Sequence, residues 1–431
     1  MSSSAFRGRA RTYGNRFQRN STSWIQKRNI QQTPPPPLGE IIATIYQSDL
    51  QAEKGDTTAK ITNSQYLTSY NWLTGREPRI IIPGEPPAWT PLSTPTKLKE
   101  DSGVYYRDQN AARYASYPME PMVQAILASK PDFSLQSVDI VACGNTLGNL
   151  LRFIRGEDKP FRILVEVVGT TVFFMRRENT PDEVIPDVYG YGHTFPEAYT
   201  TWCTRVKGSE SHQRVMKYDF AGMSCLVRFE ADGYLPPATE NNSSRSSGED
   251  PTEAEDNLLS SIERATISNV PSSGGSKTDP KSLSISAGGE RISQSAIFDL
   301  KTRSIRKKDE DTLDKELPRL WISQIPNFIL AHHKAGVFND IQVLDVWERV
   351  TQWEQDQQAT LAKFAELLNK IVSFARSSES GRFEIIHEDS AAVLELRAQC
   401  ADAGRVLPVS VAKEWSDEVL ESDRDSSDGS F

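Results

Sequence analysis

Hydrophobic and polar residues alternate with a period of two along residues 223–232. One side of the pattern carries Met223, Cys225, Val227, Phe229 and Ala231, and the other carries Arg228, Glu230 and Asp232. This period is typical of a β-strand with one buried face. Glu230 and Asp232 then share the polar face, where two carboxylates raise each other's pKa unless a cation or a hydrogen-bond network holds them.

A second segment with the same period, SAIFDLKTR, covers residues 295–303. Its two sides carry Ala296, Phe298 and Leu300 on one face and Ile297, Asp299 and Lys301 on the other. If the two strands pair or neighbour each other, the carboxylates Glu230, Asp232 and Asp299 converge on one cation. Lys301 lies beside them on the same face.

Carboxylate oxygens in such a cluster suit Mg²⁺ or Mn²⁺. A divalent ion there lowers the pKa of a bound water and stabilises charge on a phosphate oxygen, while the lysine orients or activates the nucleophile. The residues therefore point to the hydrolysis of a phosphodiester or a pyrophosphate.

Shorter patterns predict the remaining elements. Strands are expected at residues 69–73, 79–84, 138–142, 161–169, 171–178, 383–389 and 393–397, with a hairpin turn at Gly169 and Thr170. A helix is expected at residues 119–129 and a helical segment at residues 317–336. A long amphipathic helical stretch carries Val343, Trp347, Val350, Leu361, Phe364, Leu368 and Ile371 at helical spacing.

Changes in composition divide the chain. Residues 1–37 form a basic arm and a proline linker, and residues 235–289 are rich in serine and acids, so both are expected to be disordered. Residues 38–234 and 290–410 supply the two parts of one α/β domain, and residues 411–431 an acidic disordered tail. The predicted architecture is a mixed central sheet flanked by helices.

The formal net charge of the chain is −9, although its first thirty residues carry no acid. Their basic residues are Arg7, Arg9, Arg11, Arg16, Arg19, Lys27 and Arg28. Arginines interleaved with glycine and aromatic residues suit sequence-tolerant contact with RNA.

Four cysteines without paired CxxC spacing suggest neither a zinc cluster nor a disulfide framework, and they fit a reducing compartment. The longest apolar stretch, residues 161–175, is interrupted by Arg162 and Glu166 and is too short to span a bilayer. The polar N-terminus lacks the apolar core of a signal peptide. We therefore expect a protein of the nucleus or cytoplasm with no membrane segment.

The spacing E-x-D followed by D-x-K is similar to that of the PD-(D/E)XK nuclease superfamily. In chain order, the segments VDIVACGNTLGNLL, FRILVEVVGTTVFFMRRE, GYGHTFPEAY, FEADGY, FDLKTRS and LWISQ resemble the decapping exoribonuclease (DXO) family. The likeness covers roughly residues 139–397 and rests on the order of several short motifs. It implies a nuclease-like fold and hydrolysis at RNA 5′ ends, as a pyrophosphohydrolase, a decapping enzyme or a 5′-3′ exoribonuclease. It also implies RNA and a 5′-3′ exoribonuclease protein as partners.

Residue by residue, the resemblance implies a set of metal-binding carboxylates at Glu197, Glu230, Asp232 and Asp299. Leu300 would add its backbone carbonyl to this set. Lys301 would be the catalytic lysine, and Gln324 would help to place the scissile phosphate or the attacking water.

Three positions depart from the family pattern. Asp299 stands where the family has glutamate, and the segment GHTFPE that contains Glu197 is one residue longer than the family motif. Cys143 stands where the family has an arginine, which puts recognition of the substrate 5′ end in question. Candidate replacements for that arginine are Arg152, Arg155 and Lys159.

Two other functions are compatible with the sequence. A non-catalytic member of the same fold that binds RNA or a protein would explain the loss of the motif arginine. The segments at residues 59–73, 82–91 and 227–234 also look like a filamentous-fungal group labelled geranylgeranyl pyrophosphate synthetase. A prenyl synthase needs two aspartate-rich clusters in an all-helical fold, and the chain offers only DEDTLD at residues 309–314.

Overall fold

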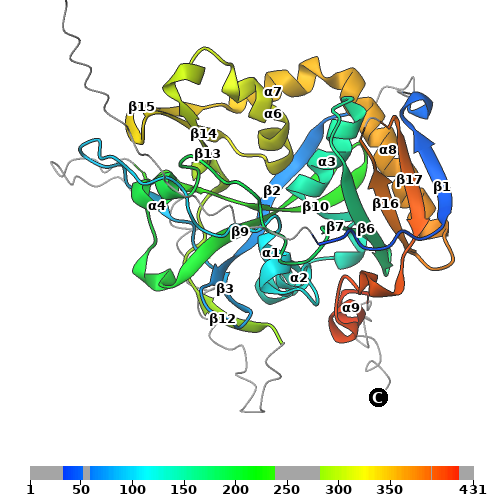
Figure 1. Ribbon diagram of the computed structural model, residues 1–431. Helices are drawn as coiled ribbons and strands as arrows, with labels where there is room; N and C mark the ends of the chain where they lie inside the picture. Colours follow the sequence, from blue (N-terminus) through cyan, green and yellow to red (C-terminus); the bar gives the residue numbers. More distant parts are fainter. Residues whose placement is uncertain (1–32, 52–58, 238–281, 390, 417–431) are drawn as a thin grey trace, which may run out of the picture. The chain divides into compact units, whose positions relative to one another are not determined.

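The computed structural model describes residues 33–51, 59–237, 282–389 and 391–416 (Figure 1). Residues 34–431 make up one compact unit, and residues 1–33 are grouped separately. The basic arm, most of the predicted serine-rich insertion and the end of the acidic tail lie outside the described residues, so their expected disorder stays a prediction.

Within the described residues, eleven strands form one large mixed sheet. They are β1 (Ile41–Tyr46), β2 (Ile61–Leu73), β3 (Arg79–Pro83), β5 (Ile140–Cys143), β6 (Phe161–Val168), β7 (Thr171–Arg177), β9 (Ser209–Phe220), β10 (Met223–Glu230), β12 (Ser284–Gly288), β16 (Arg382–His387) and β17 (Val393–Ala398). Their spatial order is β1-β17-β16-β6-β7-β5-β10-β9-β2-β3-β12. The pairs β5–β7, β5–β10 and β3–β12 are parallel, and the other pairs are antiparallel.

A second, smaller sheet of six described strands lies beside it in the chain's compact unit. Its strands are β4 (Ala88–Trp89), β8 (Thr200–Thr201), β11 (Gly233–Tyr234), β13 (Ile297–Ser304), β14 (Asn327–Lys334) and β15 (Val337–Asp345). They follow the order β15-β14-β13-β11-β4-β8, with β13 and β14 parallel. The short strand β11 links the two sheets, because it continues the chain directly after β10.

Helices cover both faces of the large sheet. Their bounds are α1 (Gln109–Arg113), α2 (Glu120–Ser129), α3 (Gly144–Ile154), α4 (Thr194–Tyr199), α6 (Thr312–Ser323), α7 (Trp347–Asp356), α8 (Gln358–Ser377) and α9 (Val409–Ser416). Helices α3, α6 and α8 share a hydrophobic core with one face, while α2 and α9 pack on the other (Figure 1). No helix among the described residues is both long and apolar enough to cross a bilayer.

The predicted α/β fold with a mixed sheet between helices is confirmed. In β10, the apolar positions from Met223 to Phe229 join the core under α3 and α8, whereas Glu230 lies on the opposite face, at the edge of a cavity. The hairpin at Gly169 is also confirmed, since β6 and β7 pair around it and its φ of 62° is one that glycine adopts without steric cost.

The helical prediction for residues 317–336 is wrong after Ser323. Helix α6 ends there, Gln324 takes a left-handed conformation, and the chain continues as strand β14. Pro326 disfavours helix in the residue before it, and the apolar run that follows pairs with β13. A short apolar run reads equally well as a buried helix or a buried strand. Val343 likewise belongs to strand β15 rather than to the long amphipathic helix.

Two predicted domain limits are also wrong. The last residues of the expected insertion form strand β12, which pairs with β3 at the edge of the large sheet. The expected tail begins inside helix α9, where Val411 and Trp415 are buried. The Trp415 Nε1–H donates to Thr171 Oγ1 at 3.1 Å, so α9 belongs to the folded unit.

A buried ion-pair network ties three strands of the large sheet together. Glu384 of β16 is fully buried and accepts hydrogen bonds from Arg162 of β6 at 2.8 Å and Arg177 of β7 at 3.1 Å. Arg162 also donates to the Pro36 carbonyl at 2.7 Å, which fixes the chain before β1.

We expect Glu384→Gln to lower the free energy of unfolding by about 3 kcal/mol, because it leaves the largely buried Arg162 without a carboxylate and Arg177 with only the more exposed Asp402. Urea unfolding followed by circular dichroism measures the loss. The control is Glu395→Gln, whose ion pair with Arg397 is more exposed and is expected to contribute less than about 1 kcal/mol. Equal losses in the two variants would contradict the assignment.

Candidate functional site

The two predicted carboxylates of β10 lie where the chain passes from the large sheet to the small one. Glu230 is the last residue of β10, and Gly233 already pairs with Phe298 of β13. A Cβ atom on Gly233 would lie 2.5 Å from the Phe298 ring, so only glycine allows this close approach. The Leu300 N–H donates to Asp232 Oδ2 at 2.7 Å. The crossing therefore places Asp232 against the strand that carries Asp299.

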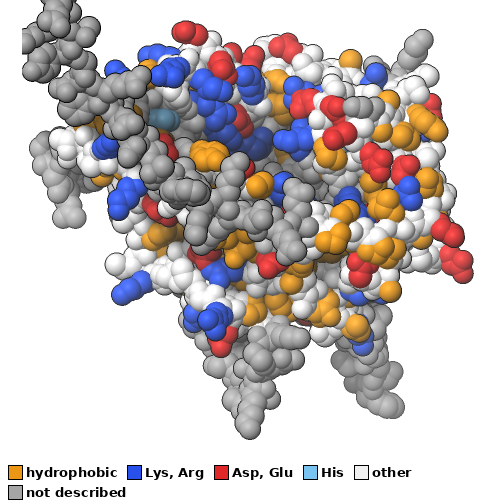
Figure 2. All heavy atoms as spheres, in the orientation of Figure 1, with side chains coloured by type: hydrophobic (Ala, Val, Ile, Leu, Met, Phe, Trp, Pro, Cys, Tyr) orange, Lys and Arg blue, Asp and Glu red, His pale blue; other side chains and the backbone are white. Residues whose placement is uncertain are grey.

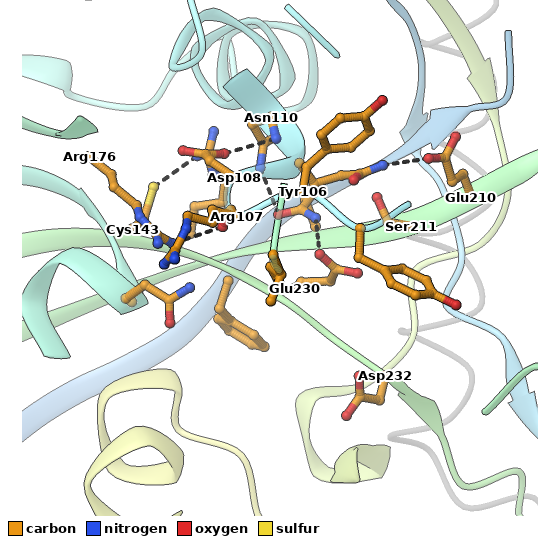
Figure 3. A pocket seen from close by; sticks show the side chains of 18 of the residues that line it. Tyr106, Arg107, Asp108, Asn110, Cys143, Arg176, Glu210, Ser211, Glu230 and Asp232 are labelled. Carbon is orange, nitrogen blue, oxygen red and sulfur yellow. Dashed lines mark hydrogen bonds between the residues drawn. The ribbon is translucent and has the colours of Figure 1, made fainter. Parts of the chain in front are cut away.

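A cavity of about 520 Å³ opens at this crossing. All four predicted metal ligands line it: Glu197, Glu230, Asp232 and Asp299. Glu197 comes from α4, and the Asp101 carboxylate fixes the start of that helix by accepting the N–H groups of His193 and Thr194 at 3.1 and 2.9 Å. In Figure 3, Glu230 lies between Asp232 on one side and Cys143 and Arg176 on the other.

Burial perturbs two of these carboxylates. Burial, followed by repulsion from Asp299, raises the pKa of Asp232 to about 8, although Arg319 opposes the shift. Burial also raises the pKa of Glu230, against a hydrogen bond that Gln213 donates to it at 3.2 Å. The site therefore disfavours the charged form of both carboxylates unless a cation binds beside them.

Arg319 supplies the positive charge that faces this group. From α6, its guanidinium contacts both carboxylate oxygens of Asp299, with Nη2 2.7 Å from Oδ1, and its Nε donates to Glu316 at 3.1 Å. Within the part of the chain that the structure describes, no three His, Cys, Asp or Glu side chains lie close enough together to hold one metal ion. As folded, the four acids share a cavity but do not form a closed coordination shell.

The two predicted catalytic residues lie outside the cavity lining. Lys301 lies two positions after Asp299 in β13, and its Nζ is 3.3 Å from Glu316 Oε1. Gln324 is buried at the end of α6, where its side-chain amide donates to the Trp321 carbonyl at 2.6 Å. Their catalytic roles stay predictions.

The opposite end of the cavity is basic. Its lining includes Arg107, Arg176 and Arg228. Arg228 and Cys143 are register partners in β10 and β5, with the Arg228 Nη2 2.8 Å from the Cys143 sulfur. The replacements predicted for the missing motif arginine, Arg152, Arg155 and Lys159, do not line the cavity.

The roles of Arg319 and Arg228 are not predicted from the sequence. The alternation along β10 placed Arg228 on the polar face with Glu230, which was an available signal. For Arg319 the sequence offers a weaker signal, which is its i,i+3 spacing from Glu316 on a predicted helix.

Residues 40–415 match the family model described as a domain of unknown function, DUF8563. The chain belongs to the DUF8563 family. No curated protein sequence matches this DUF8563 member.

Solved structures of Rai1 share the fold. The match to Scheffersomyces stipitis Rai1 in complex with (3′-NADP)⁺ and calcium has a TM-score of 0.54 and 12% identity, and it covers 88% of this chain and 99% of that one. The match to Candida albicans Rai1 in complex with pU5-Mn²⁺ has a TM-score of 0.51 and 10% identity, and it covers 87% and 98%. The match to S. pombe Rai1 has the same TM-score and identity and covers 83% and 99%.

Rai1 belongs to the decapping exoribonuclease family, so the resemblance predicted from the sequence is confirmed for the fold. At these identities the likeness concerns the fold alone. The prenyl-synthase alternative is wrong, because that activity needs an all-helical fold and this chain contains two β-sheets.

Gln324 offers a test that separates the contribution of its backbone conformation to stability from that of its side-chain hydrogen bond. Its φ of 54° is unfavourable for most side chains, so Gln324→Gly is expected to change the free energy of unfolding by less than about 1 kcal/mol. Gln324→Val, with a β-branched side chain at positive φ, is expected to lower it by about 2 kcal/mol or more. Thermal unfolding of both variants measures this difference. Equal destabilisation would mean that the side-chain hydrogen bond, not the backbone, decides stability here.

Proposed function

We propose that this protein is a divalent-metal-dependent hydrolase that acts on RNA 5′ ends. The observation that carries the proposal is that all four carboxylates of the predicted metal set line one cavity in a chain with the Rai1 fold. The Rai1 structure from Candida albicans contains pU5 and Mn²⁺, which supports both the substrate class and the metal. Removal of a pyrophosphate, decapping and 5′-3′ degradation are the three reactions included.

The donor set fits Mg²⁺ or Mn²⁺ in its chemistry. All four donors are carboxylates, and Asp232 and the buried Asp299 repel each other, so the pair attracts a cation. When bound, the ion would lower the pKa of a water and stabilise charge on a phosphate oxygen. Since Arg319 contacts Asp299 through both oxygens, Asp299 can serve as a ligand only after that contact opens.

We assign to Lys301 the role of orienting the water that acts as the nucleophile. Lys301 shares the face of β13 with Asp299, and Glu316 holds its ammonium group near the same helix that carries Arg319. A rotation of this long side chain away from Glu316 would bring Nζ toward the cavity, where it would orient the attacking water.

RNA binding has a further basis on the surface. Figure 2 shows Lys and Arg side chains gathered over the part of this face formed by α6 and the strands β13 and β14. Such a patch on an acidic protein suits the phosphates of an RNA chain. The proposal includes action in the nucleus or cytoplasm and a 5′-3′ exoribonuclease as a protein partner.

A second candidate function is RNA binding without catalysis. The specific observation in its favour is the contact of Arg319 with both oxygens of Asp299, since a guanidinium on the carboxylates can replace a metal ion as their counter-charge. Such a protein would bind RNA 5′ ends in the same cavity.

An RNA hydrolysis assay distinguishes the two functions. With Mn²⁺, we expect the purified protein to hydrolyse an RNA that carries a 5′-triphosphate or a 5′ cap. The double variant Asp299→Ala plus Lys301→Ala is expected to lose activity by about a hundredfold or more, because it removes a metal ligand and the group that orients the nucleophile.

The matched control is Asp340→Ala plus Lys308→Ala, an Asp–Lys pair 2.7 Å apart in the same part of the fold that does not line the cavity. It should keep the activity of the parent protein. No turnover of either RNA by the parent protein, with RNA binding intact, would favour the non-catalytic function.

Competition between Arg319 and the metal gives a further prediction. We expect Arg319→Gln to bind Mn²⁺ at least about tenfold more tightly in calorimetric titration, because Asp299 loses its resident cation. Arg303→Gln is the control, since Arg303 also reaches Glu316, at 3.7 Å, but has no contact with Asp299 among the described residues. Unchanged or weaker Mn²⁺ binding by Arg319→Gln would show that the guanidinium and the metal do not compete.

A further inference from the structure

Arg228 is a buried cation in the cavity wall that has no ion-pair partner among the described residues. Its side chain is 2% exposed and lines the cavity. Its guanidinium donates to the Pro118 carbonyl at 2.7 Å, contacts the Cys143 sulfur at 2.8 Å and lies 3.5 Å from the Tyr70 hydroxyl. None of these three groups is a carboxylate. Because arginine stays charged and an unpaired buried charge is unfavourable, this position attracts an anion.

The start of helix α3 faces the same end of the cavity. Gly144 and Asn145 line it, and the N-cap residue Cys143 accepts no side-chain capping hydrogen bond from the helix. The first turn of α3 contains no acidic residue. Unpaired N–H groups and the positive end of the helix dipole add to the charge of Arg228.

Two further arginines border this end. Arg176 of β7 lines the cavity and donates to the Arg107 carbonyl at 2.9 Å, and Arg107 lines it as well. Asp108 is the acid that Figure 3 shows beside Cys143, and its carboxylate caps α1 by accepting the N–H groups of Asn110 and Ala111. Arg176 and Arg107 also form ion pairs with Glu178 and Glu183, so Arg228 is the arginine at this end that no carboxylate contacts among the described residues.

An unpaired polar group lies elsewhere in the same cavity. Ser211 of β9 is 5% exposed and lines the cavity, and its hydroxyl has no hydrogen-bond partner in the part of the chain that the structure describes. A buried hydroxyl without a partner is unfavourable unless a ligand or water satisfies it. The cavity is thus prepared for a polar ligand that extends past its basic end.

We propose that the basic end, built from Arg228, the start of α3 and Arg176, binds the terminal phosphate of an RNA 5′ end. The phosphate assignment rests on the proposed function, and the volume of about 520 Å³ suits a nucleotide rather than a long chain. Arg228 thereby supplies, from the strand next to Cys143, the guanidinium that the family carries at the position of that cysteine. The phosphate would lie at one end of the cavity and Asp232 and Asp299 at the other, with Glu230 between them.

The test uses the full-length protein in EDTA, so that neither metal nor turnover contributes. Fluorescence anisotropy compares a five-uridine RNA with a 5′-monophosphate and the same RNA with a 5′-hydroxyl. We expect the phosphorylated RNA to bind at least about tenfold more tightly, the effect of charge-assisted hydrogen bonds. Arg176→Met should reduce the preference to below about threefold, and Arg228→Met should abolish it.

Arg155→Met is the matched control, because Arg155 caps the far end of α3, pairs with Glu157 at 3.1 Å and lies outside the cavity lining. It should keep the full preference. If circular dichroism shows that Arg228→Met is not folded, Arg176→Met alone decides. Equal binding of the two RNAs by the parent protein, or an undiminished preference in the folded cavity variants, would overturn the subsite.

The binding preference in EDTA is measured separately from hydrolysis in Mn²⁺, so the two proposals can fail separately. A phosphate preference without turnover in Mn²⁺ would uphold the subsite and remove the hydrolytic function. Turnover in Mn²⁺ without a phosphate preference would support the hydrolytic function and overturn the subsite.

Discussion

The hydrogen bond from the Leu300 N–H to Asp232 connects the two sheets at the candidate site, at a donor–acceptor distance of 2.7 Å. It exists because the chain leaves the large sheet after Glu230 and joins the small sheet at Gly233, where the Phe298 ring leaves no space for a Cβ atom. Without this crossing, the carboxylates of β10 and the Asp299 of β13 would belong to separate sheets. The cavity, its concentration of acids and the position of Arg319 all follow from it.

Charge separation within the cavity is the second organising feature. The acidic end holds Asp232 and Asp299, while the basic end holds Arg228 and the start of α3. In a partly buried site, both groups act on a ligand with less screening than on the surface. A ligand with two phosphates, such as an RNA 5′ end, suits both ends of the cavity. Its terminal phosphate would bind the arginines, and its reacting phosphate would lie beside a cation held by the acids.

The parts of the site that the sequence predicts are those set by the period of the strands. Alternation along β10 and β13 correctly groups Glu230 with Asp232 and Asp299 with Lys301, because side chains of a strand must alternate between its faces. Residues 327–334 are predicted as helix but form strand β14, because a short apolar run has no decisive period. The contacts of Arg319 and Arg228 depend on how α6 and β5 pack, and no local pattern in the sequence encodes such packing. The same limit applies to Gln324, whose left-handed backbone turns its side chain back to Trp321.

The contact between Arg319 and Asp299 distinguishes a catalytic site from one that only binds its ligand. A shared fold at 10–12% identity does not decide between them, because one fold can keep its shape while its site changes. A guanidinium that contacts both oxygens of Asp299 balances the negative charge of the acids as folded. Unlike a divalent metal ion, it does not activate a bound water as the nucleophile for hydrolysis. If the contact is permanent, the cavity binds a phosphate between fixed charges. If Asp299 were released from Arg319 to hold a divalent ion, the guanidinium would become available to stabilise negative charge on a bound phosphate. The strength of this one ion pair relative to metal binding therefore determines which of the two functions the fold performs.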